Sequence, residues 1–173
     1  MKVLVLGSDN ARSIILETSK GTRIDNYQVL EISNFERNQF IKYDKANFPM
    51  VIFRSSPSPE YNCHGLTFAS RRTNIDNSIA IRLILSEDRY CEIGIREVLP
   101  GDVVLYVNKD DKEIVHSGIV SACEHPPNSF SHITIVSKWG RFREVIHDLN
   151  NCPYNSFQRE FYRIKHEQYE QNN

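Results

Sequence analysis

The alternation of apolar runs and polar turns along the second half of the chain predicts an antiparallel sheet. The polar segment 108–112 has the composition of a hairpin tip and joins two of these runs. We therefore expect a meander of about four strands, at residues 103–107, 113–123, 133–136 and 142–146. Residues 157–164 fit a strand or a helix equally, because their aromatic content favours a sheet while Phe157, Phe161 and Ile164 have helical spacing.

Helical periodicity is found before this meander. The apolar residues between positions 75 and 84 recur at helical spacing, which predicts an amphipathic helix over residues 77–89. A shorter helix is expected to begin at Cys63, because Asn62 is a favourable N-cap and the prolines at 57 and 59 keep the preceding segment extended.

The first third of the chain has a weaker pattern. Residues 2–6 and 13–18 have the composition of strands and could pair as a hairpin, and residues 49–54 form a short strand candidate. Residues 25–32 and 40–43 follow neither a period of 2 nor one of 3.6, which predicts an irregular or partly helical segment.

The order of these elements, two helices followed by a meander, indicates an α+β fold. We expect a single domain over residues 1–173, with residues 1–55 as a lead-in, 56–165 as the core and 166–173 as a frayed tail. The lead-in would either form a wall beside a substrate or complete the sheet.

Composition narrows the classes of partner. The 21 basic residues nearly balance the 22 acidic ones, so bulk charge gives no reason to expect binding to nucleic acid or to a membrane surface. The apolar run at residues 3–6 is too short for a signal peptide or a membrane span, which predicts a protein that is cytoplasmic or exported without a classical signal peptide.

The four cysteines indicate neither a cofactor nor a structural metal. They lie far apart without a C-x-x-C pair, which argues against a zinc knuckle, and a domain of 173 residues does not require a disulfide. A site using Cys63, His64 and His116 as metal ligands is the least favoured alternative, because Cys63 and His64 are adjacent and would both have to turn toward one ion. We expect no cofactor and no metal.

Cys63 is the main candidate for chemistry. At the first turn of a helix, the free amides and the helix dipole favour a negative charge and lower the pKa of a thiol. The thiolate is the form that attacks carbonyl carbons. The structural alternative is a buried cysteine that serves as a small apolar filler.

A cysteine nucleophile needs a base, and His116 is the best candidate among six histidines. It lies in a predicted strand and is followed at position 118 by glycine, where another group can approach closely. His64 is adjacent to Cys63 and would point away from it around a helix. A histidine that only packs in the sheet is the structural alternative for His116.

Three motifs in this order resemble those of the papain-like cysteine peptidases and amidases of the NlpC and CHAP type. They are NCHGL at residues 62–66, LPGDVVLY at 99–106 and HSGIV at 116–120. The resemblance implies a helix that carries the cysteine, packed on an antiparallel sheet of about four to six strands. It also implies Cys63 as nucleophile and His116 as general base.

Other residues of such a site are less clear in this chain. The family places a polar residue on the next strand to hold the imidazole, but residues 136–140 read VSKWG here. His147 or Ser137 could take this role, with His147 narrowly favoured. Tyr61 could help to hold an oxyanion or could pack in the core, and Trp139 could wall the cleft or pack in the core.

The function implied is a cysteine-dependent amide-bond hydrolase, a peptidase or amidase that forms an acyl-enzyme intermediate. Its substrate would be a peptide, protein or peptidoglycan-type amide. The same cysteine and histidine would also serve a deamidase or acyltransferase effector. A catalytically inactive papain-like binding module is the alternative from another class. The sequence does not distinguish these substrates or predict an oligomeric state.

Overall fold

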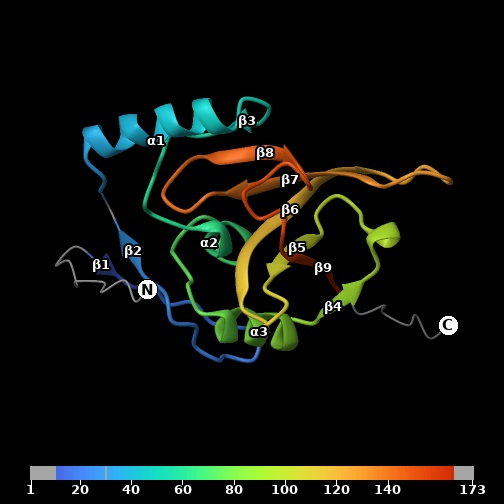
Figure 1. Cartoon of the computed structure of the whole chain (residues 1–173). Helices are drawn as coiled ribbons and strands as arrows, with labels where there is room; N and C mark the ends of the chain where they lie inside the picture. Colours follow the sequence, from blue (N-terminus) through green and yellow to red (C-terminus); the bar gives the residue numbers. More distant parts are fainter. Residues whose placement is uncertain (1–10, 30, 166–173) are drawn as a thin grey trace, which may run out of the picture.

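The computed structural model describes residues 11–29 and 31–165, and these form three helices and a seven-stranded antiparallel sheet (Figure 1). The helices are α1 (Asn34–Asn47), α2 (Cys63–Phe68) and α3 (Ser78–Glu87), with a short 3₁₀ helix at Ile95–Glu97. The strands are β1 (Ala11–Arg12), β2 (Gln28–Val29), β3 (Ile52–Phe53), β4 (Tyr90–Ile93), β5 (Val103–Val107), β6 (Ile114–Glu124), β7 (His132–Lys138), β8 (Glu144–Asp148) and β9 (Gln158–Ile164).

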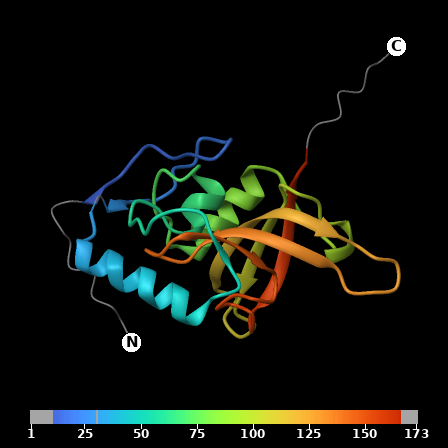
Figure 2. The ribbon, with the colours of Figure 1, turned by 90° about the horizontal axis from the view of Figure 1, so that it is seen from above.

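The predicted α+β class and the meander are confirmed, but the sheet is larger than expected. Its strand order is β3-β8-β7-β6-β5-β9-β4, so the meander β5 to β8 forms only its centre. β9 is a strand, because it pairs with β5 on one side and with β4 on the other. The short-range pattern of residues 158–164 could not reveal these two long-range partners. The β6–β7 hairpin extends beyond the other strands (Figure 2).

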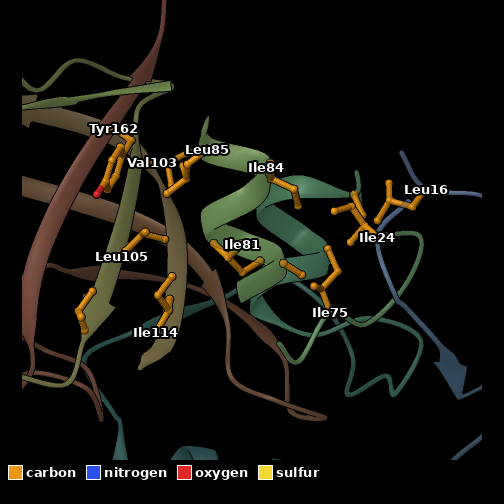
Figure 3. Close-up of a cluster of buried hydrophobic side chains, with 13 residues drawn as sticks. Leu16, Ile24, Ile75, Ile81, Ile84, Leu85, Val103, Leu105, Ile114 and Tyr162 are labelled. Atoms are coloured by element: carbon orange, nitrogen blue, oxygen red, sulfur yellow. The ribbon is translucent and has the colours of Figure 1, made fainter. Parts of the chain in front are cut away.

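The alternation of side chains along β5 divides the core in two. Val103, Leu105 and Val107 belong to a cluster with α3, whereas Val104 and Tyr106 belong to a second cluster on the other face of the sheet. Figure 3 shows the first cluster, in which α3 points side chains toward β5 and also toward the N-terminal segment. The helix predicted over residues 77–89 is confirmed as the ten-residue α3.

Helix α1 was not predicted as such. Its sequence has no continuous apolar stripe, and Asp44 is its only buried residue. A capping box marks its start, with Ser33 as N-cap and Glu36 at the third helical position, and this signal was available in the sequence. Packing of the aromatic pairs Phe40–Phe142 and Phe48–Trp139 holds α1 beside the turn between β7 and β8.

The prediction of a strand at residues 13–18 is wrong. Residues 13–18 contain only one isolated bridge, Glu17 to Arg23, and β1 pairs with β2 instead. The predicted strand at residues 2–6 lies outside the described residues, as does the predicted tail from 166. Among the described helices, none has the length and apolar character that a membrane span requires.

Candidate active site

Cys63 is the first residue of α2, and the residue before it fixes the start of the helix. The side chain of Asn62 accepts a hydrogen bond from the Gly65 amide at 2.9 Å, as an N-cap does. The amide group of Asn62 donates to the Ile75 carbonyl at 2.9 Å and to Asp76 Oδ1 at 2.8 Å. The predicted cap is therefore present, and the chain before α3 holds it in place.

Gly65 lets α2 lie directly on a neighbouring segment. A Cβ atom at this position would lie 1.7 Å from the carbonyl oxygen of Thr73. Because that obstacle is backbone, no side chain can be accommodated without moving one of the two segments. The position of the Cys63 thiol thus depends on the glycine two residues after it.

His116 lies at the start of β6, opposite Tyr106 of β5, and is fully buried. Pairing of β6 with β7 begins only at Gly118, so His116 has a strand neighbour on one side alone. Its ring stacks on Tyr154 with 3.9 Å between ring centroids and an angle of 9°. Neither ring nitrogen has a hydrogen-bond partner among the described residues.

His64 is held by a chain of three hydrogen bonds. Its Nδ1 lies 2.9 Å from the hydroxyl oxygen of Ser117, which lies 3.0 Å from the hydroxyl oxygen of Thr67. The Thr67 hydroxyl donates to the carbonyl of Cys63 at 2.9 Å. Since that donation uses the Thr67 proton, Ser117 donates to Thr67 and accepts from His64. This assignment leaves Nε2 as the basic nitrogen of a neutral His64.

Both imidazoles act on the thiol. Burial raises the pKa of Cys63, but the charges of His64 and His116 outweigh burial and bring the pKa well below its ordinary value. Burial lowers the pKa of His64, and the charge of Cys63 outweighs this effect, so the pKa of His64 is raised. The arrangement therefore favours a thiolate beside an imidazolium.

A cleft of about 420 Å³ opens at this thiol. Its lining contains Cys63, His64 and Tyr154 as well as the charged side chains Asp76, Glu113 and Arg141. The cleft provides room for a substrate at the reactive sulfur, with polar groups on its walls.

The two candidates for a third member, His147 and Ser137, bond to each other. His147 Nε2 lies 2.9 Å from the Ser137 hydroxyl, and its Nδ1 lies 2.8 Å from the Asp148 carbonyl. Ser137 also accepts from the indole nitrogen of Trp139 at 3.1 Å. These contacts satisfy both nitrogens of His147, so neither candidate holds the His116 ring.

Tyr61 and Trp139 also lie away from the thiol cleft. The Tyr61 hydroxyl donates to Glu144 at 2.6 Å, so the proton expected to hold an oxyanion has a partner already. Trp139 is 4% exposed and lines a second cavity instead of the thiol cleft. For Tyr61 the geometry favours the packing alternative.

Sequence reasoning missed His64, Ser117 and Tyr154. The objection to His64 was the angle between adjacent helical side chains, but the Cβ atoms of a first turn tilt toward the helix N-terminus, so both side chains reach the same end. Ser117 follows His116 directly, so its side chain points to the opposite face of β6, where it contacts α2. Tyr154 lies in a segment with no pattern, and nothing in the sequence indicated it.

Cys63, Cys91, Cys123 and Cys152 are all free thiols. Within residues 11–29 and 31–165, no group of three or more histidine, cysteine, aspartate or glutamate side chains has an arrangement that could hold a metal ion. Compared with protein-family models, curated proteins and solved structures, the chain matches none of them. The papain-like identity thus stays a prediction from the three sequence motifs.

Proposed function

We propose that this protein is a cysteine-dependent amide-bond hydrolase of papain-like type, with Cys63 as the nucleophile. The observation that supports it is the thiol at the start of α2, which opens on a cleft and has its pKa lowered by two imidazoles. A buried cysteine that served only as filler would have its pKa raised, as burial raises that of Cys152.

The chemical steps follow from these groups. The Cys63 thiolate attacks the amide carbonyl carbon, a carbon–sulfur bond forms, and the carbon–nitrogen bond breaks as the amine leaves with a proton from an imidazolium. Water then attacks the thioester, which releases the carboxylic acid and restores the thiolate. His116 is the expected base, and His64 is a second imidazole able to carry the proton. The free amides at the start of α2 favour the developing oxyanion.

The experiment that tests this proposal is acylation by an activated ester. After incubation with p-nitrophenyl acetate, we expect an acetyl group on Cys63 and on none of the other three cysteines, together with catalytic release of acetate. The Cys63→Ala variant should lose both. Acetylation spread evenly over the four cysteines, or release of acetate that persists without Cys63, would contradict the proposal.

Adding a free amine separates hydrolysis from transfer. An acyltransferase gives the amide of that amine as product, whereas a hydrolase continues to release acid. A non-catalytic papain-like binding module is the second candidate, because among the described residues no third side chain bonds to His116 to orient the base. Acetylation of Cys63 without turnover would favour that candidate.

A further inference from the structure

A second cavity, of about 230 Å³, lies next to the thiol cleft. Five of its lining residues are aromatic: Tyr43, Phe48, Trp139, Phe142 and Tyr154. Gly140 and Pro153 add no charge, so among the described lining residues Asp44 is the only ionisable acid or base apart from the tyrosines. An aromatic wall with one carboxylate is a distinctive chemical environment for a ligand.

The rings form a connected group between α1 and the turn that follows β7. Ring centroids lie 4.6 Å apart for Phe48 and Trp139, and 5.5 Å apart for Tyr43 and Phe142. Tyr43 is half exposed at 52%, whereas Trp139 is buried. The group therefore has a deep end and a solvent-facing end.

Asp44 is buried in this wall, and one oxygen of its carboxylate lacks a donor. Only 1% of the residue is exposed; Oδ2 accepts from Arg143 Nε at 3.1 Å, and Oδ1 has no partner among the described residues. The Arg143 guanidinium lies 3.4 Å from the ring centroid of Phe53 and does not line the cavity. Burial raises the pKa of Asp44 even with Arg143 beside it. One oxygen of the carboxylate is therefore without a donor, and Nη2 of its partner Arg143 is without an acceptor among the described residues.

The cavity adjoins the thiol cleft through shared lining residues. Gly140 and Tyr154 line both spaces, and the ring of Tyr154 stacks on His116. A group bound in the cavity thus contacts the same tyrosine that packs on the candidate base. A molecule that filled both spaces would lie across Cys63.

We propose that this cavity binds an organic ammonium group, such as a lysine or N-methylated lysine side chain, carried by the molecule that Cys63 attacks. The second half of this statement rests on the proposed function. Aromatic faces attract cations, and Asp44, whose other oxygen is paired with Arg143, adds one unpartnered acceptor oxygen to the same wall. An uncharged side chain of the same shape would gain the apolar contact but leave that oxygen without a partner.

Trp139 is the only tryptophan of the chain, so intrinsic fluorescence reports on this cavity directly. The probes are choline and its uncharged carbon analogue, 3,3-dimethylbutan-1-ol. We expect saturable quenching by choline with an affinity about tenfold higher than that of the alcohol. Equal affinities, or no fluorescence response to choline, would overturn the proposal.

Substitutions of cavity residues test whether choline binds in this cavity. Asp44→Asn should reduce the preference for choline to about threefold or less, while Asp110→Asn at the exposed β5–β6 turn should leave it unchanged. If Asp44→Asn does not fold, Tyr43→Leu at the half-exposed end keeps the Asp44–Arg143 pair and should weaken choline binding severalfold. Choline binding that is insensitive to both variants would contradict the assignment.

Cys63→Ala separates the two proposals. It should bind choline as the wild type does, because Cys63 does not line the aromatic cavity. If choline binds with the expected preference but Cys63 fails to acylate, the ammonium site stands and the hydrolase proposal fails. If Cys63 acylates and choline does not bind, the hydrolase proposal stands and the ammonium site fails.

Discussion

His64 and His147 are two histidines in nearly the same surroundings, yet their pKa values shift in opposite directions. They are 4% and 2% exposed, and each has a ring nitrogen 2.9 Å from a serine hydroxyl, Ser117 for one and Ser137 for the other. Burial lowers the pKa of His147 to about 4, whereas the pKa of His64 is raised.

The group that faces each ring accounts for the difference. The second nitrogen of His147 donates to the carbonyl of Asp148, and burial outweighs the favourable effect of this bond and of the Asp148 charge on a charged ring. His64 interacts with the Cys63 thiolate, and each charge stabilises the other. Burial of a histidine in this fold therefore does not indicate function, whereas burial beside an opposite charge does.

Among the variants that test this comparison, Cys63→Ala should have the largest effect. It should abolish acylation completely and also reverse the shift of the His64 pKa, because burial is the largest effect on the ring and its main opponent, the Cys63 charge, would be absent. We expect the pKa of His64 to fall below the ordinary value of about 6.5, as seen by NMR titration of the imidazole. A His64 pKa that stays raised in this variant would show that the thiolate is not the cause.

Gly65→Ala should displace α2, which carries Cys63 and His64, and leave the surroundings of His147 in place. Because the new Cβ would overlap the Thr73 carbonyl, α2 must move, and we expect a loss of about 3 kcal/mol or more in unfolding free energy. Gly94→Ala is the matched control, since its Cβ would meet only the end of the Glu97 side chain at 3.0 Å. Urea unfolding measures both, and similar losses would contradict the close approach of α2.

His147→Gln tests, through the pH dependence of stability, whether burial holds the His147 ring neutral. The folded pKa of about 4 lies below the unfolded value of 6.5, so the unfolded state takes up the proton first as pH falls. Stability is then unaffected above pH 6.5 and decreases between 6.5 and 4, by about 3 kcal/mol in total. Urea unfolding at pH 7 and pH 4.5 should show a weaker pH dependence for the variant than for the wild type.

The surface variant His132→Gln serves as its control, because that histidine is exposed. It should keep the pH dependence of the wild type. If His147→Gln also keeps it, the ring is not held neutral by burial.

Ser117→Ala should give the smallest effect. His64 would lose the acceptor of its Nδ1 proton, and that loss affects the orientation and tautomer of the ring while the thiolate stays in place. We expect alkylation of Cys63 by iodoacetamide near pH 6 to slow by about threefold to tenfold. Ser121→Ala in the exposed half of β6 should leave the rate unchanged.

The sequence was informative where local chemistry decides the structure. Asn62 predicted the start of α2, and the turn at Pro100 and Gly101 predicted β5, because caps and turns depend on a few adjacent residues. It failed for α1, whose helix depends on aromatic contacts with the β7–β8 turn, and for the strand partners of β9. Both depend on residues that are distant in sequence.

In the candidate site, too, the sequence predicted what adjacent residues decide and missed what distant residues decide. Cys63 and His116 carried local signals and lie close enough for His116 to lower the pKa of the thiol. The stacking of Tyr154 on His116 and the bond of Ser137 to His147 depend on how separate segments meet, so no spacing rule could predict them. Of the two roles predicted for the lead-in, completing the sheet agrees with the pairing of β3 with β8, whereas a wall beside a substrate stays a prediction.

The most direct test of the thiolate in this site is the rate of iodoacetamide alkylation at each of the four cysteines from about pH 5 to pH 9, read by peptide mass spectrometry. We predict that Cys63 alone reacts fast in the acid half of this range, and that His64→Ala and His116→Ala each reduce this advantage. A Cys63 that reacts no faster than Cys91 and Cys123, or whose rate is unchanged in both variants, would contradict the pairing of thiolate and imidazole.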